Sequence, residues 1–326
     1  MKKYIKNIFI LSILSLITFE ILTDSKSILE AVNFAFNIWK ENVFPSLFPF
    51  FMLSELFINY GLIEILGELF KPFMNKFFKA KGVTAFALVM SIISGFPSSA
   101  KYIKELYNKN LINEFEASKA LMFTHFSNPL FILGTISLLF LNNKEVGLLI
   151  LICHYLGNFI IGFIFRNYIP SKEIKSRKKI KTILKEISEN NIKKGKSFGE
   201  VVTSALLNSI NTLILILGVI TMFLVITTII DNNINLSNLN QSILNGFFEM
   251  TQGLKYVSMQ EIPLKLKCTL SVMIISFGGL SVHMQIISIL SDTKIKYLPF
   301  LTARIIHSLI SSLLIFFLFD YWMAFF

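Results

Sequence analysis

Long runs without a charged residue are the feature that most restricts what this chain can fold into. A helix that crosses the hydrocarbon of a bilayer needs about 20 mostly apolar residues, because each unpaired backbone group would cost several kcal/mol there. Long uncharged runs cover residues 82–100, 120–143, 146–165, 201–230 and 268–291, and shorter ones cover 7–19, 42–54 and 305–319. The period-2 alternation of strands is absent, so we expect an all-α, polytopic integral membrane protein.

Composition supports this class. The chain is 54% hydrophobic and only 16% charged, with 34 Phe, whereas soluble domains average about 25% charged residues. These values exclude a disordered chain and argue against a soluble enzyme. The two cysteines, Cys153 and Cys268, lie in separate apolar runs, so we expect neither a disulfide nor a CxxC metal site. No HExxH or GxSxG motif is present, and we expect no metal, no cofactor and no enzymatic activity.

Basic residues predict the topology. Lys2, Lys3 and Lys6 precede the first run, which ends without a small-x-small cleavage site, so an uncleaved span is favoured over a signal peptide. Residues 170–196 hold ten Lys or Arg against three acids, an excess of +7. Both segments are expected in the cytoplasm, because basic residues beside short spans stay inside. Nucleic-acid binding is the weaker interpretation of the basic segment.

The number of runs between these two cytoplasmic segments is odd. Five runs lie between them, so one should enter and leave the membrane on the same side. The best candidate is 82–100, because Gly95 and Pro97 interrupt its centre and helix breakers at membrane depth require a protein-lined or wet environment. Lysines flank both of its ends, at Lys71, Lys76, Lys79, Lys81, Lys101 and Lys104.

A second interrupted run predicts an internal repeat. Residues 276–281 read SFGGLS, and aligning Ser98 with Ser281 brings His125 opposite His307. Each half then contains a span, a broken hairpin and a span with a histidine. The two halves would be inverted in the membrane, an arrangement typical of secondary transporters. Lysines in the expected outward loops of the second half, such as Lys265 and Lys294, leave its orientation open.

The expected organisation has four parts. They are an N-terminal membrane span (1–27), a first gate-type repeat (28–169), a basic cytoplasmic linker (170–197) and a second gate-type repeat (198–326).

Several motifs strongly resemble the sporulation integral membrane proteins of the YlbJ type. They are VFPSLFPFF at 43–51, SGFPSSAK at 94–101, SNPLF at 127–131, HYLGN at 154–158, SFGGLSV at 276–282 and ARIIH at 303–307. The resemblance covers roughly residues 28–320. It implies two gate modules, a module also seen in nucleoside transporters, and a role in late sporulation with passage of dipicolinic acid from mother cell to forespore. Relative to the family pattern, Ser99 and the Thr124-His125 pair are departures.

Polar groups inside apolar runs are costly and therefore functional candidates. The two interruptions supply the expected substrate-binding residues, with a packing kink as the alternative for each glycine: Gly95, Pro97, Ser98, Ser99, Gly278, Gly279 and Ser281. Asn128, before Pro129, adds a second helix break and an amide. Arg304 and Lys101 would supply positive charge to an anion, or would extend to the membrane interface.

Three further residues are candidates for coupling or for substrate charge. His125 and His307 would bind an anion or carry a proton, or would only hydrogen bond between helices. Glu249 is an acid in an apolar stretch and would couple to a cation or a proton, or would pair with Arg304.

The expected function is transport of a small aromatic dicarboxylate, dipicolinate, by a multi-pass cell membrane protein located in the mother-cell or outer forespore membrane. A non-transporting scaffold of the spore envelope and a nucleoside-type transporter are the alternatives. The bilayer, the anionic substrate, and a homo-oligomer or other sporulation membrane proteins are the expected partners; nucleic acid is not.

Overall fold

The computed structural model describes residues 2–169, 180–194 and 197–326, and all regular structure in this part of the chain is helical. The predicted all-α class is thus confirmed. Residues 170–179 and 195–196 of the predicted basic linker lie outside the described residues.

The first half contains the following helices: α1 (Lys2–Thr23), α2 (Ser25–Ile38), η1 (Trp39–Val43), α3 (Phe44–Asn59), α4 (Leu62–Leu69), α5 (Lys71–Phe73), η2 (Met74–Phe78), α6 (Thr84–Ser94), α7 (Ser98–Asn108), α8 (Glu114–Phe123), η3 (Phe131–Phe140), α9 (Glu145–Ile164) and η4 (Phe165–Asn167). The linker helix is α10 (Ile180–Lys194), and the second half contains α11 (Phe198–Asn233), α12 (Asn238–Phe248), α13 (Met250–Met259), α14 (Leu264–Phe277), α15 (Gly279–Leu290) and α16 (Leu298–Met323).

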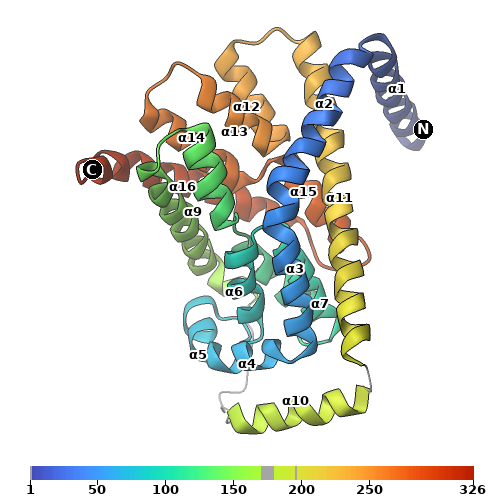
Figure 1. Ribbon diagram of the computed structural model, residues 1–326, viewed down its shortest axis with the longest axis vertical. Helices are drawn as coiled ribbons and strands as arrows, with labels where there is room; N and C mark the ends of the chain where they lie inside the picture. Colours follow the sequence, from blue (N-terminus) through green and yellow to red (C-terminus); the bar gives the residue numbers. More distant parts are fainter. Residues whose placement is uncertain (1, 170–179, 195–196) are drawn as a thin grey trace.

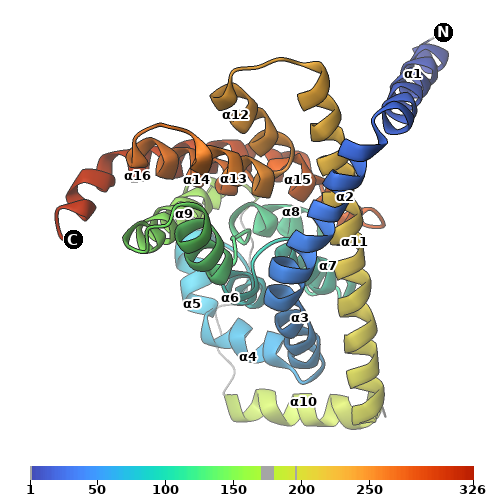
Figure 2. The ribbon, with the colours of Figure 1, turned by 45° about the horizontal axis from the view of Figure 1, so that its top comes forward.

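Four stretches of the described chain are long and apolar enough to cross a membrane: Glu145–Asn167, Phe198–Asn233, Leu264–Leu290 and Leu298–Met323. A fifth candidate consists of Asn7–Thr23 and Ser25–Asn59, which meet at an angle of 99°. Figures 1 and 2 show α1 projecting away from the other helices at this bend. Apolar side chains of α1 such as Phe9 and Leu11 are largely exposed, as expected for a helix that faces lipid.

The predicted break in 82–100 is present. α6 ends at Ser94, α7 begins at Ser98, and the two short helices pack against each other as a hairpin. Asn128 also lies in a break, because the chain is not helical between α8 and Asn128. In the second half, however, α14 and α15 form one interrupted span, whereas α12 and α13 form the packed hairpin. The expectation of a hairpin at Gly278 was therefore wrong.

Helix boundaries reveal a repeat with a different register from the one expected. A single shift in residue number relates two pairs of helix ends: those of α6 (Ser94) and α12 (Phe248), and those of α8 (Phe123) and α14 (Phe277). A shift that is smaller by one residue relates the starts of α9 (Glu145) and α16 (Leu298). This shift pairs His154 with His307. The alignment of Ser98 with Ser281 and of His125 with His307 is thus corrected.

The corrected register explains why the sequence alignment failed. That alignment relied on the Gly/Ser motifs of the two interruptions. In the structure, the residue that corresponds to Gly95 is Glu249, at the tip of the α12–α13 hairpin. The second hairpin therefore carries no glycine or serine motif that sequence comparison could match to the first.

Corresponding helices of the two halves run in opposite directions. α2 and α3 lie beside α11 along their whole length (Figure 1). Trp39 donates a hydrogen bond to the carbonyl of Leu213 over 2.8 Å, and the side-chain amide of Asn232 donates to the Asp24 carboxylate over 2.6 Å. Residues early in α2 therefore meet residues late in α11, so the pair is antiparallel. This is the relationship expected of inverted repeats.

Candidate functional site

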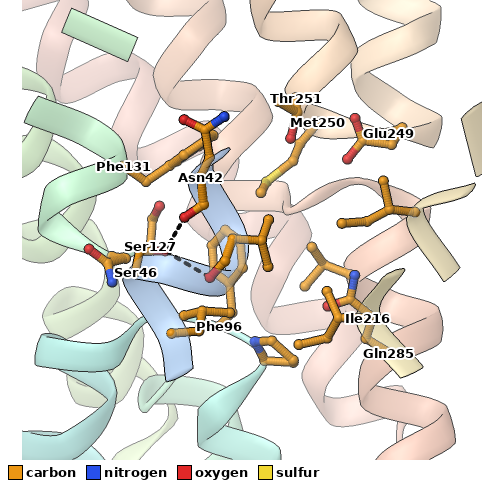
Figure 3. A pocket seen from close by; sticks show the side chains of 16 residues that line it. Asn42, Ser46, Phe96, Ser127, Phe131, Ile216, Glu249, Met250, Thr251 and Gln285 are labelled. Atoms are coloured by element: carbon orange, nitrogen blue, oxygen red, sulfur yellow. Dashed lines mark hydrogen bonds between the residues drawn. The ribbon is translucent and has the colours of Figure 1, made fainter. Parts of the chain in front are cut away.

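A cavity lies between the two halves, where their helices are interrupted. Its empty volume is about 530 Å³, a figure that includes space open to solvent. Its walls are Asn42, Val43, Ser46, Leu47, Phe96, Pro97, Ser127, Asn128, Phe131, Ile216, Ile220, Glu249, Met250, Thr251, Val282 and Gln285. Figure 3 shows Ser46, Ser127 and Phe131 on one side and Glu249, Ile216 and Gln285 on the other.

The first interruption depends on Gly95. Its φ of +78° is a left-handed conformation, which only glycine adopts without strain. A Cβ at this position would lie 2.6 Å from the backbone nitrogen of Asn128, so the two breaks of the first half touch. The Ser98 hydroxyl bonds to the Gly95 carbonyl and lies 2.7 Å from the Ser94 hydroxyl. These local bonds hold the turn that places Phe96 and Pro97 on the cavity wall.

The second interruption is pressed against the tip of the α12–α13 hairpin. Gly278 and Gly279 have φ values of +94° and +67°. A Cβ on Gly279 would lie 3.1 Å from the backbone nitrogen of Met250. Glu249, at the tip, is 1% exposed and accepts the backbone N–H of Gln252 over 2.9 Å. The carboxylate therefore caps α13, and both breaks of the second half meet at the cavity.

Four helices begin at this cavity. α7 follows Pro97, the helix containing η3 begins after Asn128, α13 begins at Met250, and Val282 lies in the first turn of α15; all four of these residues line the cavity. A helix N-terminus carries unpaired N–H groups and a partial positive charge of roughly half an elementary charge. Glu249 already caps α13 and Asn128 accepts the Leu130 N–H before η3, whereas α7 and α15 have no side-chain cap, so the last two N-termini make the cavity favourable for a negatively charged group.

The side chains of the walls are polar but mostly neutral. Asn42, Asn128 and Gln285 contribute amides, and Ser46, Ser127 and Thr251 contribute hydroxyls. Phe96 and Phe131 supply flat apolar surfaces. Among the lining residues in the described part of the chain, Glu249 is the one charged side chain. A ligand here would be held by neutral donors, backbone N–H groups and aromatic contacts.

Arg304 does not line the cavity. It is fully buried, and its guanidinium donates to the Asn158 side chain over 2.7 Å, to the His125 carbonyl over 3.3 Å and to the Met122 carbonyl. It also donates to Nδ1 of His307 over 2.8 Å. The guanidinium of Arg304 therefore lies at the C-terminal end of α8, where the helix dipole favours a cation. Arg304 does not form an ion pair with Glu249 among the described contacts.

Two of the four intramembrane histidines belong to the Arg304 network, and a third lies behind the cavity wall. His307 and His154 lie in the Arg304 network, and His154 accepts the backbone N–H of Ser127 over 2.9 Å. His125 lies behind the cavity wall: its ring stacks on Phe96 at a centroid distance of 4.9 Å, and its Nδ1 lies 3.1 Å from the Ser99 hydroxyl. His125 therefore supports the wall from behind rather than lining the cavity.

Lys101 lines a second, polar cavity. Its ammonium pairs with Glu55 over 2.9 Å and lies 5.1 Å from the ring centre of Phe51. The second cavity has an empty volume of about 1000 Å³ including open solvent, and is lined by residues of α3, α7, α11 and α15. Three of these helices, α3, α11 and α15, also contribute to the walls of the first cavity. Lys101 and Glu55 both line the second cavity.

Of the predicted residues, Pro97, Asn128 and Glu249 line the cavity, and Gly95, Ser98, Gly278, Gly279 and Ser281 form the breaks that shape it. Four polar lining residues were not predicted from the sequence: Asn42, Ser46, Thr251 and Gln285. Gln285 is an amide inside the uncharged run 268–291, and the cost of such a group in a membrane could have identified it.

Inverted halves, interrupted helices and a cavity between them define a polytopic membrane protein with a central cavity. A family model described as "Gate: Nucleoside recognition" matches residues 41–144. Over 336 residues the chain is 32% identical to the "Sporulation integral membrane protein YlbJ" of Bacillus subtilis (strain 168), covering 95% of this chain and 82% of that protein. The chain therefore belongs to the YlbJ-type family of sporulation integral membrane proteins. No solved structure matches it.

Proposed function

We propose that the chain is a transporter that carries dipicolinate, a small aromatic dicarboxylate, through a membrane of mother-cell origin towards the forespore. The observation that carries this proposal is the convergence of helix N-termini, two of them without a side-chain cap, on one cavity between inverted halves. Such N-termini bind carboxylates through backbone N–H groups without a basic side chain. In this account the N-terminus and the basic linker lie in the cytoplasm, and the protein is not an enzyme.

The cavity walls suit the shape and chemistry of this substrate. Phe96 and Phe131 both line the cavity and would offer apolar contacts to a planar ring, while the two carboxylates, which flank the ring nitrogen, would need hydrogen-bond donors. The amides of Asn42 and Gln285 lie on different helices around the cavity (Figure 3) and would supply such donors. The second cavity shares α3, α11 and α15 with the first and would provide the route by which the substrate reaches the solvent.

A nucleoside is the second candidate. The observation that favours it is the lack of basic side chains in the lining: the described lining residues include three amides and no Lys, Arg or His. A side-chain amide has both donors and an acceptor, so it can hydrogen bond to the edge of a neutral base as well as to a carboxylate. The name of the matched family model is not by itself evidence of a nucleoside substrate.

Spore composition tests the proposal. Cells that lack the protein should still synthesise dipicolinate but should form spores poor in it. Normal dipicolinate content in these spores would contradict the proposal. With purified protein in liposomes, dipicolinate uptake without uridine or adenosine uptake supports the first candidate, and the reverse supports the second. Absence of both fluxes would indicate a scaffold.

A further inference from the structure

The carboxylate of Glu249 has no counter-charge within reach. It is 1% exposed and lines the cavity. No Lys, Arg or His of the described chain lies within ion-pair distance of it. Burying an unpaired carboxylate is costly, so buried charges are normally paired or bind a metal ion. A dianion in the same cavity would add repulsion to this cost.

Oxygen atoms surround this carboxylate. The Ser281 hydroxyl is fully buried and meets no hydrogen-bond partner at ordinary geometry in the described structure. It lies beside Glu249, as does the hydroxyl of Thr251. Ser281 comes from the first turn of α15 and Glu249 from the α12–α13 tip, so two separate elements direct oxygens to one place. A buried carboxylate that has no counter-ion, with hydroxyl oxygens directed at it from two separate elements, indicates a missing cation.

Backbone carbonyls complete the arrangement. A Cβ on Gly279 would lie 3.2 Å from the carbonyl oxygen of Gly246 and 3.3 Å from that of Phe248. Both carbonyls belong to the last turn of α12, where they lack a partner within their own helix and carry the partial negative charge of its C-terminus. Close approach at Gly279 therefore brings the start of α15, the helix that carries Ser281, to these oxygens.

From this geometry we propose a binding site for a sodium ion between the α12–α13 tip and α15, with the Glu249 carboxylate, the hydroxyls of Ser281 and Thr251, and the carbonyls of Gly246 and Phe248 as its oxygen donors. Hard cations take oxygen ligands, and carbonyl ends of interrupted helices bind sodium in membrane carriers. One carboxylate balances one positive charge, which favours a monovalent ion.

The ion would couple to transport by charge compensation. With sodium bound, Glu249 no longer repels an anion, and the helix N-termini around the cavity can hold it. Sodium would therefore bind with the substrate and move with it down its gradient. This coupling rests on the proposed transport function, but binding of the ion to the protein does not.

Thermal unfolding of the purified full-length protein in detergent tests the site. Sodium chloride is titrated against choline chloride at constant ionic strength and pH. We expect the unfolding midpoint to rise by about 3 °C or more and to saturate, because a ligand that binds only the folded state stabilises it. Glu249→Gln and Ser281→Ala should abolish the rise. Glu261→Gln removes an exposed acid of the same region and should retain it.

Equilibrium binding of radioactive sodium to the wild type does not depend on how the variants fold. Saturable binding of about one ion per chain supports the site, and its absence overturns it. A midpoint that follows pH alone, equally in sodium and choline, also overturns it in favour of a proton. Dipicolinate uptake without sodium binding would refute the site but not transport, whereas sodium binding without any uptake would do the opposite.

Discussion

His307 donates a hydrogen bond from Nε2 to the backbone carbonyl of His154 over 2.8 Å, and the two rings lie 4.9 Å apart. These histidines occupy equivalent positions in α16 and α9, so the bond joins the two halves at corresponding points. Because Nε2 donates, Nδ1 of a neutral ring is free to accept from Arg304, as it does over 2.8 Å. His307 therefore donates from one ring nitrogen and accepts at the other, and these two hydrogen bonds join the two halves.

Arg304→Met should destabilise the protein more than it weakens substrate binding. The change leaves the carbonyls of Met122 and His125 and the Asn158 side chain without their donor, at a cost of about 1–3 kcal/mol for each group left unpaired. We expect a strongly lowered unfolding midpoint, with the KM of the remaining folded protein changed less than threefold. Arg166→Met, at a half-buried arginine, is the control and should lower the midpoint less. A stable Arg304→Met protein with a KM raised tenfold would instead assign Arg304 to the substrate.

Gly95→Ala should abolish transport. Alanine would cost about 1–3 kcal/mol of backbone strain at this φ, and its Cβ would collide with Asn128, so the cavity wall must move. Gly134→Ala is the matched control, because nothing lies within 4 Å of a Cβ there, and its uptake rate should equal that of the wild type. Equal uptake by both variants would show that the first interruption does not shape the site.

Gln285→Leu should raise the KM for substrate about tenfold, the effect of about 1.4 kcal/mol of lost interaction. Leucine keeps most of the volume but removes the amide that faces the cavity, so the unfolding midpoint should stay within about 2 °C of the wild-type value. Gln241→Leu, at a glutamine that does not line the cavity, tests for general effects. A KM unchanged in both variants would remove Gln285 from the substrate contacts.

Exchanging the charges of Lys101 and Glu55 tests the ion pair that they form at the second cavity. Lys101→Glu places a second carboxylate beside Glu55, and like charges at this distance repel strongly. We expect uptake to fall at least tenfold. The double variant Lys101→Glu with Glu55→Lys restores opposite charges and should recover most of the rate. No recovery in the double variant would mean that the identity of the residues matters rather than their pairing.

Local sequence predicted one interruption well and the other poorly. Gly95 and Pro97 lie two residues apart at the centre of an apolar run, a pairing that disfavours a continuous helix, so the α6–α7 hairpin could be expected from the sequence. The second hairpin turns at Glu249, without a glycine or a proline at its tip. Its break depends on the packing of Gly279 against Met250, which belongs to a different helix. The conspicuous glycines at 278–279 therefore suggested a hairpin where the structure has an interrupted span.

Arg304 shows a second limit of sequence reasoning. A charge inside an apolar run correctly indicated a special position. Its role could not be inferred, because its partners Met122, His125 and Asn158 lie 146 to 182 residues away in the chain. Asn42 was missed for the same reason, since only the folded arrangement brings its helix to the cavity, whereas Gln285 could have been identified as an amide inside an apolar run.

Uptake of radiolabelled dipicolinate by proteoliposomes tests the central claim most directly. The account predicts saturable uptake by the wild type and by Gly134→Ala, competed by unlabelled dipicolinate but not by uridine, and none by Gly95→Ala. Wild-type protein that is folded and correctly inserted but moves no dipicolinate above the level of empty liposomes would contradict the account.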